Sequence, residues 1–407
     1  MARPQRPPRR RIAVTLILSA AGCGAVVVLA QASVPGGQGA PIRLMYGNGS
    51  HKKKPAALIQ PGWRIVDAPA AVAPWSTGLA DVSALGPRQA WAVGEADDIA
   101  GQRSVPVLKV WDGNSWRTDA TPPLPAGVTE AGFTQVRAIT ADNVWIFGWG
   151  RRGADTYAYA WHWAGTRWQT TELGRSLDGV HAAVGGPRDV QVTGFVTAAS
   201  GRKPWAKRYD GTSWKKVPMP AYAHALRGRT GKDLWGVGET KAGKPAAMRW
   251  TGKAWSLVPV PAKLHGHDYT LTAVLPIGPR NVWATAAVRG KGTSSPDTAG
   301  SALLHWTGAG WTQVVGHART GAAGLPAADG AGGVWYTTSK TATGSRLVHY
   351  TPTGKGTTSR RAPATSGTAS TLTALTLIPG SRSLWAVGSL AAASGPRDGS
   401  AIDKYGW

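Results

Sequence analysis

"KRYDGTSWKKVPMP", residues Lys207–Pro220, contains the pattern that decides the fold. An aromatic residue ends a strand-like segment, Asp-Gly and two small residues follow, and a Trp begins another short strand that stops at Pro218. Asp hydrogen-bonds to the backbone of a turn, and Gly tolerates the positive φ of a tight hairpin. The pattern therefore predicts a β-hairpin around Asp210. Near-copies recur as "KVWDGNSW", "WHWAGTRW", "MRWTGKAWSLVPVP" and "LHWTGAGWTQVV".

A second signal, typified by "VWAVG", alternates with this hairpin. Its seven copies lie 44 to 54 residues apart and are centred on Trp91, Trp145, Gln191, Trp235, Trp283, Trp335 and Trp385. Short strands of the form apolar-x-Ala precede most copies. One unit therefore holds four strands, which we name a (the apolar-x-Ala strand), b ("VWAVG"), c (ending in the aromatic) and d (beginning with Trp). Four short strands at this period are typical of a β-propeller blade.

Composition agrees with an all-β protein. Trp outnumbers Phe 21 to 3, which indicates a repeated structural slot, and 54 Gly with 29 Pro favour many tight turns. The last unit, "AIDKYGW", ends without a strand d, whereas "PGWRIVDAPA" near residue 63 reads as a strand d without a strand c. We therefore predict a seven-bladed β-propeller of four-stranded blades over residues 61–407, closed by an N-terminal strand that completes the last blade.

The N-terminus reads as an export signal. Three arginines precede an apolar run over residues 12–29, and Ala30-Gln31-Ala32 offers a cleavage site. We assign residues 1–32 to a signal peptide, with an uncleaved anchor and a lipidated Cys23 as the alternatives, and residues 33–60 to a flexible basic linker. The protein is thus expected to be secreted. Cys23 is the sole cysteine, so the cleaved chain has no disulfide and no cysteine-bearing zinc site.

The chain is strongly basic. Its net charge is +25, and +20 remains without residues 1–32, which hold five Arg and no acid. Such a charge favours anionic partners. We expect a carbohydrate or an anionic wall polymer rather than nucleic acid, and membrane contact only through an uncleaved N-terminal segment. A basic surface that serves solubility alone is the alternative.

The "VWAVG … RYDGTSW … V" pattern resembles tectonin-type propeller repeats, more loosely kelch repeats, and the Trp-rich propellers of secreted actinobacterial proteins. The resemblance covers residues 61–407 and lies in structural positions. Because tectonin-type proteins often bind carbohydrate on microbial surfaces, it implies a lectin-like role. It transfers no site residue to this chain.

Candidate ligand-binding residues come from two places. The central position of strand a reads Ser83, Arg137, His181, His224, Thr272 and Thr373, a polar ring near the axis. The connections between strands b and c carry basic residues and two indoles outside the repeat slots, which suit anionic substituents and sugar faces. The ligand-binding prediction is Trp149, Arg151, Arg152, Arg202, Lys203, Trp205, Arg137, His181 and His224. A water-filled channel and solvated charges remain the structural alternatives.

Catalysis has little support in the sequence. No nucleophile elbow, zinc-protease helix or phosphate loop occurs. "HGHD", with His265, His267 and Asp268, is a weak metal pattern, and we expect no metal and no cofactor. A lectin-like binding module is the leading hypothesis. The alternatives are a protein-interaction scaffold in a secreted assembly and a glycan-active hydrolase or lyase that uses His181, His224 or the His265 cluster.

Overall fold

The computed structural model describes part of the chain. It divides the chain into two units, Met1–Ala57 and Leu58–Trp407, and every described residue belongs to the second. The predicted export signal and linker therefore lie outside the described residues. No helix in the described part is long and apolar enough to span a membrane. The described ranges are 62–68, 75–98, 103–175, 177–198, 201–264, 266–289, 298–318, 325–337, 345–362, 364–365, 368–392 and 397–406.

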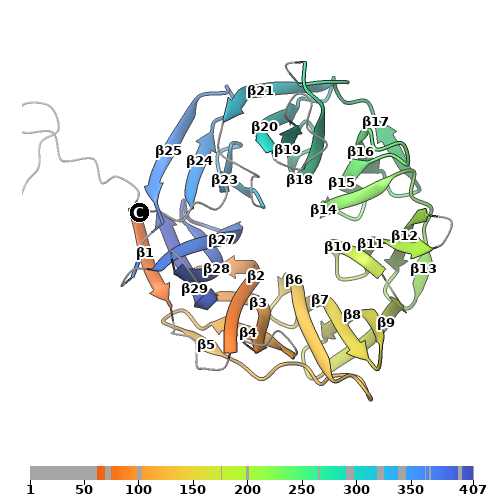
Figure 1. The fold of residues 1–407 in the computed structure, drawn as a ribbon, viewed down its shortest axis with the longest axis vertical. Helices are drawn as coiled ribbons and strands as arrows, with labels where there is room; N and C mark the ends of the chain where they lie inside the picture. Colours follow the sequence, from red (N-terminus) through yellow and green to blue (C-terminus); the bar gives the residue numbers. More distant parts are fainter. Residues whose placement is uncertain are drawn as a thin grey trace, which may run out of the picture. The chain divides into compact units, whose positions relative to one another are not determined.

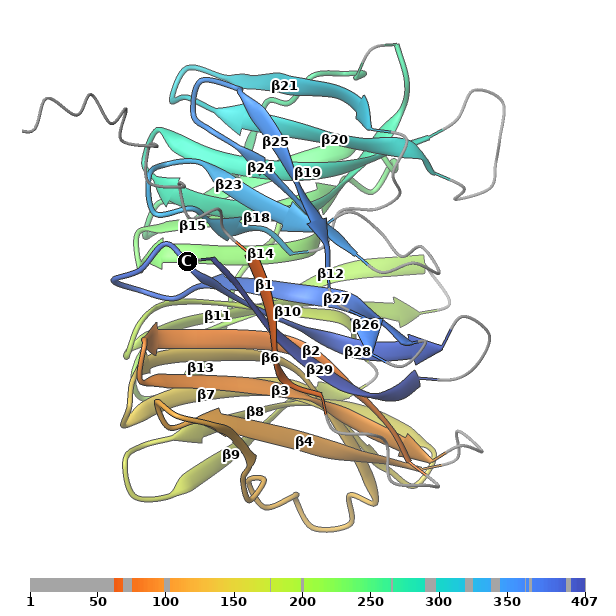
Figure 2. The same cartoon turned by 90° about the vertical axis from the view of Figure 1, so that its left-hand side faces the viewer.

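Seven antiparallel sheets form the seven blades of a β-propeller, so the predicted fold class is confirmed. In Figure 1 the sheets surround a central axis. Turned by 90°, the same sheets lie one above another (Figure 2). The described residues form strands and no helix.

The first four blades follow the predicted order of strands. Blade 1 contains β2 (Trp75–Gly86), β3 (Gln89–Asp98), β4 (Ser104–Trp111) and β5 (Trp116–Thr118). Blade 2 contains β6 (Glu130–Thr140), β7 (Asn143–Arg152), β8 (Asp155–Trp163) and β9 (Trp168–Arg175). Blade 3 contains β10 (Leu177–Gly186), β11 (Asp189–Ala198), β12 (Gly201–Tyr209) and β13 (Trp214–Lys216). Blade 4 contains β14 (Tyr222–Thr230), β15 (Asp233–Glu239), β16 (Pro245–Trp250) and β17 (Trp255–Val258).

The last three blades are less uniform. Blade 5 contains β18 (Tyr269–Gly278), β19 (Asn281–Arg289), β20 (Thr298–Trp306) and β21 (Trp311–Ala318). Blade 6 contains β22 (Ala327–Ala328), β23 (Val334–Thr337), β24 (Arg346–Tyr350) and β25 (Gly356–Arg361), so its innermost strand is the shortest. Blade 7 has five strands in the order β1 (Gly62–Asp67), β29 (Arg397–Gly406), β28 (Leu384–Ala392), β27 (Thr368–Leu377) and β26 (Ala364–Thr365).

The hairpin in the opening stretch forms as predicted. Tyr209 pairs with Trp214 across the turn between β12 and β13, and their ring centroids are 5.4 Å apart. One carboxylate oxygen of Asp210 accepts hydrogen bonds from the backbone N–H groups of Thr212 (3.0 Å) and Ser213 (2.9 Å). Gly211 has φ +99°. The positive φ accounts for Gly at this position of the turn, and Asp210 adds hydrogen bonds to the turn backbone.

The predicted closure is also confirmed. Strand β1 pairs antiparallel with β29, from Gly62 opposite Gly406 to Asp67 opposite Ile402, so both ends of the propeller unit share blade 7 (Figure 1). The Asp67 carboxylate then accepts a 2.5 Å hydrogen bond from the Lys109 ammonium on β4. The Lys109 side chain is 7% exposed and that of Asp67 20%. This largely buried ion pair connects the closing strand to blade 1.

Neighbouring blades are joined by a repeated aromatic contact. The strand-b Trp of one blade packs against the aromatic pair that flanks the c–d turn of the next blade. Trp235 of blade 4, for example, lies 5.5 Å from Trp306 and 5.6 Å from Trp311 of blade 5. Trp385 of blade 7 makes the same contact with Trp111 (4.9 Å) and Trp116 (5.3 Å) of blade 1. The Trp residues of the repeat therefore pack between blades.

The strand-c residue opposite the strand-b Trp covers the other face of the indole. His162 stacks on Trp145 at 3.9 Å, and His305 stacks on Trp283 at 4.1 Å. In blade 4 the guanidinium of Arg249 takes this place, 5.2 Å from the Trp235 ring. Cations and imidazoles are attracted to an indole face. This contact explains why a basic residue so often precedes the aromatic that ends strand c.

Removal of one of these indoles should weaken the whole ring. We expect Trp235→Ala to lower the free energy of unfolding by about 3–5 kcal/mol, because Trp235 is fully buried and the cavity left behind spans two blades. Equilibrium unfolding in urea measures the change. Trp149→Ala, which removes a half-buried indole outside the repeat slots, is the control and should cost less. Equal losses would contradict a special role for the interblade contact.

The closing ion pair gives a second test. We expect Asp67→Ala to cost about 3 kcal/mol, because it leaves the Lys109 ammonium buried without its partner. The double variant Asp67→Leu with Lys109→Met should recover most of this loss. Asp155→Ala, which breaks the exposed pair with Arg175, should cost less than about 1 kcal/mol. A double variant as unstable as the single one would contradict the assignment.

Candidate functional site

The innermost strands share an irregularity that determines which side chains point toward the axis. In blade 1, Leu79 pairs with Gly94 and Asp81 with Val93, so Ala80 is an extra residue opposite β3. Blades 2, 4, 5 and 7 shift register at the same place, with Thr134, His224, Thr272 and Thr373 as the extra residues. Each is a β-bulge, which re-aims the residues that follow it.

The glycine of "VWAVG" allows this bulge. A Cβ atom built on Gly94 would lie 1.9 Å from the carbonyl oxygen of Gly78, and one on Gly388 would lie 1.9 Å from that of Thr371. No side chain fits in that space. In blades 1 and 7 the glycine of strand b therefore makes room for the bulge in strand a, whereas blade 5 forms the same bulge opposite Ala286.

The six predicted ring residues occupy three different register positions relative to strand b. Ser83 and Arg137 pair with Trp91 and Trp145 of strand b, three residues after the bulge. His224, Thr272 and Thr373 occupy the bulge itself, and His181 pairs with Thr193. By register, the blade 4 counterpart of Arg137 is Arg227, opposite Trp235. The prediction of a single ring was wrong because apolar-x-Ala aligns residues that the bulge offsets.

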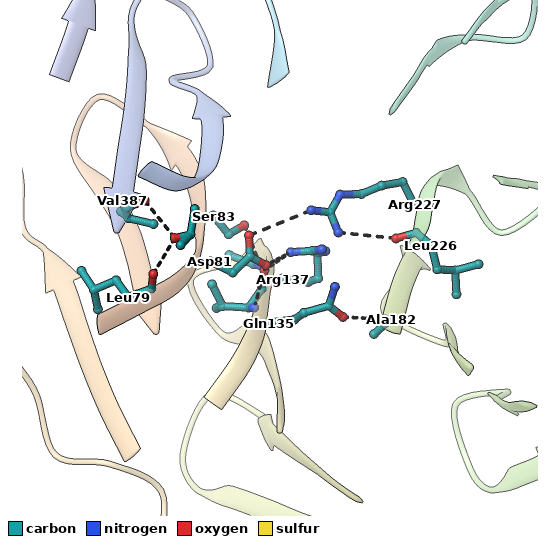
Figure 3. Close-up of polar contacts among 12 residues, drawn as sticks. Leu79, Asp81, Ser83, Gln135, Arg137, Ala182, Leu226, Arg227 and Val387 are labelled. Atoms are coloured by element: carbon teal, nitrogen blue, oxygen red, sulfur yellow. Dashed lines mark hydrogen bonds and ion pairs between the residues drawn. The ribbon is translucent and has the colours of Figure 1, made fainter. Parts of the chain in front are cut away.

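Polar side chains of the inner strands tie adjacent blades together. The Ser83 hydroxyl accepts a hydrogen bond from the Ala138 N–H (3.0 Å), and the Gln135 amide oxygen accepts one from the Ala182 N–H (2.6 Å). The Thr373 hydroxyl donates to the Leu79 carbonyl (2.6 Å). Figure 3 shows the contact between Gln135 and Ala182. Part of the polar ring is therefore structural.

A charged cluster lies on the axis beside these ties. The Asp81 carboxylate of β2 forms an ion pair with the Arg137 guanidinium of β6 and accepts the Val136 N–H at 3.1 Å. The Arg227 guanidinium of β14 approaches Asp81 from the far side of the ring, at 4.0 Å (Figure 3). Burial raises the pKa of Asp81 above its ordinary value, while Arg137 acts in the opposite direction. These residues border an axial cavity of about 290 Å³.

Two predicted histidines lie on the neighbouring inner strands. Burial lowers the pKa of His181 to about 4, and the charges of His224 and Arg137 act in the same direction. One ring nitrogen of His224 is 3.3 Å from the Leu271 carbonyl, and the other is 3.8 Å from Glu239. At neutral pH His181 is therefore uncharged and adds nothing to the positive charge of the axis.

A separate groove lies among blades 1, 2 and 7, near the b–c hairpins. It has a volume of about 160 Å³ and is lined by Glu95, Trp149 and the hydroxyl groups of Thr134, Thr373 and Ser389. The indole N–H of Trp149 donates to the Glu95 carboxylate at 3.3 Å. A Cβ on Gly132 would lie 2.0 Å from that carboxylate and 2.6 Å from the indole nitrogen. Because Gly132 has no side chain, there is room for the hydrogen bond between Trp149 and Glu95.

The other predicted basic residues lie on strands rather than in loops. Strands β7 and β8 stay paired to Arg152 opposite Asp155, and β11 and β12 to Ala198 opposite Gly201. Arg151 pairs with Glu130 (3.2 Å), Arg152 with Glu172 (3.0 Å) and Arg202 with Glu239 (3.3 Å). These three arginines are thus matched by acidic side chains.

Lys203 and Trp205 complete the predicted set. Lys203 is exposed at the start of β12, and Trp205 is half-buried with the Lys207 ammonium 5.6 Å from its ring. Neither borders the Glu95–Trp149 groove or the axial cavity. His265 of the "HGHD" stretch lies outside the described residues, and no group of three potential metal ligands forms among the residues that the structure describes.

Sequence comparison identifies no relative: no known family model and no curated protein matches the chain. Solved structures match at low identity. The β-propeller domain of the Trilobed protease from Pyrococcus furiosus, with an open velcro topology, has 9% identity and a TM-score of 0.50 over 81% of this chain and 93% of that one. A six-bladed, fucose-recognising lectin from Aleuria aurantia has 12% identity and a TM-score of 0.46 over 74% and 100%. At such identities the likeness concerns the fold.

The pKa of His181 predicts a pH effect on stability. An unfolded chain protonates this imidazole near its ordinary pKa of 6.5, whereas the folded protein does so only near 4. The stabilisation is therefore fully present above pH 6.5 and is lost as the pH falls toward 4. Relative to His181→Gln, the protein should lose up to about 3 kcal/mol of unfolding free energy over this range. Urea titrations of the wild-type protein and of His181→Gln at several pH values measure this difference. Unfolding free energies that depend on pH in the same way in both proteins would contradict the prediction.

Proposed function

We propose that this protein is an exported carbohydrate-binding propeller and that the Glu95–Trp149 groove holds a sugar unit. The observation that carries the proposal is the composition of the groove. An indole, a carboxylate and three hydroxyl groups gather at one surface depression near the b–c hairpins. Aromatic faces pack against sugar rings, and carboxylates accept hydrogen bonds from sugar hydroxyls.

The size of the groove supports a single sugar unit. About 160 Å³ is less than the roughly 300–1,000 Å³ of pockets for larger ligands. A monosaccharide at the end or edge of a longer glycan matches this space. The likeness to fucose-binding lectins such as the one from Aleuria aurantia is a likeness of fold, and the choice of sugar rests on the groove.

Exposed lysines extend the proposal to anionic polymers. Lys203, Lys241 and Lys244 lie at the b–c connections of blades 3 and 4, are exposed, and make no ion pair within the described part of the chain. They suit phosphate or carboxylate substituents on a cell-wall glycan. Such contacts add a salt-dependent contribution to binding, whereas the groove supplies the contribution that depends on the sugar.

The experiment is a glycan and wall-polymer array with the full secreted protein, at low and high salt. We expect binding to a narrow set of glycans, with Trp149→Ala weakening it at least about tenfold because the stacking surface is lost. Gly132→Ala should also weaken it, since the added methyl displaces the Glu95 carboxylate. Leu257→Ala, at an exposed residue of β17, is the control and should bind normally.

Other outcomes of the array contradict the proposal in distinct ways. Loss of binding in Trp205→Ala but not in Trp149→Ala would move the site to blade 3. Binding only to anionic polymers, abolished by salt, would reduce the interaction to charge alone. Absence of glycan binding would favour the alternative of a protein-interaction scaffold, which co-purification of a partner would then test.

A further inference from the structure

We propose that the axial cavity is a second binding site, specific for a small organic carboxylate with a short aliphatic body. The cavity of about 290 Å³ lies beside Asp81, Arg137 and Arg227, toward the carboxyl-terminal ends of the inner strands. The Glu95–Trp149 groove, by contrast, is bordered by the amino-terminal half of β2 and by the ends of β3 and β7 that lie near the b–c hairpins. The two sites share no lining residue.

Charge is the first reason for this inference. Among the described residues that line the cavity, Arg137 and Arg227 are the only cations and Asp81 is the only acid. One carboxylate faces two guanidinium groups, so the lining has an excess of positive charge. Arginine does not lose its proton in proteins, so this excess persists at every physiological pH. A monoanionic ligand would balance it.

The hydrogen-bond donors are the second reason. The Nη2 atom of Arg137 is buried and has no hydrogen-bond partner among the described residues. The nearest Arg227 nitrogen is 4.0 Å from Asp81, beyond hydrogen-bond distance, and its Nη1 donates only a long 3.4 Å bond to the Leu226 carbonyl. Figure 3 shows both guanidinium groups directed toward Asp81 across the axis. Donors on two strands are thus available to a carboxylate between them.

The walls indicate the rest of the ligand. Apart from the charged cluster, the cavity is bordered mainly by apolar residues, among them Leu275, Leu377 and Pro379, which are not fully buried. The hydroxyls of Ser83 and Thr376 are the remaining polar side chains in its lining. Few groups could bind the many hydroxyls of a sugar acid, and a single excess positive charge does not match a phosphate dianion. A short-chain carboxylate matches both the single excess positive charge and the apolar lining of the cavity.

Calorimetric titration of the full secreted protein with butyrate tests the proposal, with butyramide as an isosteric neutral probe. We expect saturable binding of butyrate and none of butyramide. Arg227→Gln should weaken butyrate binding about 10- to 100-fold, because a hydrogen bond to an ionised group is lost. Arg229→Gln is the matched control: Arg229 lies on the same strand, pairs with Asp233 at 2.9 Å and does not line the cavity.

A second variant keeps the charges and removes the space. Leu275→Trp should fill the cavity and abolish butyrate binding while Asp81, Arg137 and Arg227 remain. Circular dichroism confirms that each variant folds, and glycan binding should be unchanged in both because neither residue borders the groove. Equal binding of butyrate and butyramide, equal effects of the two arginine variants, or no butyrate binding to the folded wild-type protein would overturn the proposal.

Discussion

The packing of one Trp against the aromatic pair of the next blade is the contact on which the ring depends. A four-stranded sheet cannot bury both of its faces by itself, and in most blades the strand-b indole therefore packs against the neighbouring blade. Trp335 of blade 6 lies 5.1 Å from Tyr405 of β29, and Tyr405 lies 5.0 Å from Trp63 of β1. The aromatic pair of blade 7 thus comes from both ends of the unit. The pairing of β1 with β29 that closes the ring therefore also forms the aromatic pair against which Trp335 of blade 6 packs.

The blade count, the strand order and the closing strand could all be predicted because each depends on a local pattern repeated in sequence. Blade 3 shows why repetition tolerates substitution. Gln191 replaces the strand-b Trp, and its amide oxygen accepts a 2.9 Å hydrogen bond from the indole of Trp255 in blade 4. The interblade contact survives as a polar one. The repeat can still be recognised at blade 3 because its partner in blade 4, Trp255, is retained.

The candidate sites could be predicted only in part, since they depend on register and on distant partners. Arg137 was found because it occupies the central position of the apolar-x-Ala pattern, and Trp149 because it lies outside the repeated Trp positions. Arg227 was missed because the apolar-x-Ala motif of blade 4 lies at the bulge itself, whereas the motif of blade 2 lies three residues after its bulge. Asp81 and Glu95 were missed for another reason: their partners lie 54 to 56 residues away in the next blade. No local pattern carries that information.

The strong positive charge is a weaker guide to partners than it first seemed, because much of it is used inside the fold. Lys109 holds the closing strand, Arg249 and Lys404 cover the indoles of Trp235 and Trp385, and Arg208 bonds Asp189 at 2.7 Å. Arg208, Arg249 and Lys404 occupy the same position in strand c of their blades, so part of the basic charge of this propeller follows from packing. The charges that can recognise a ligand are those without such a task. They include the exposed lysines near the b–c hairpins and the two guanidinium groups that share one carboxylate on the axis.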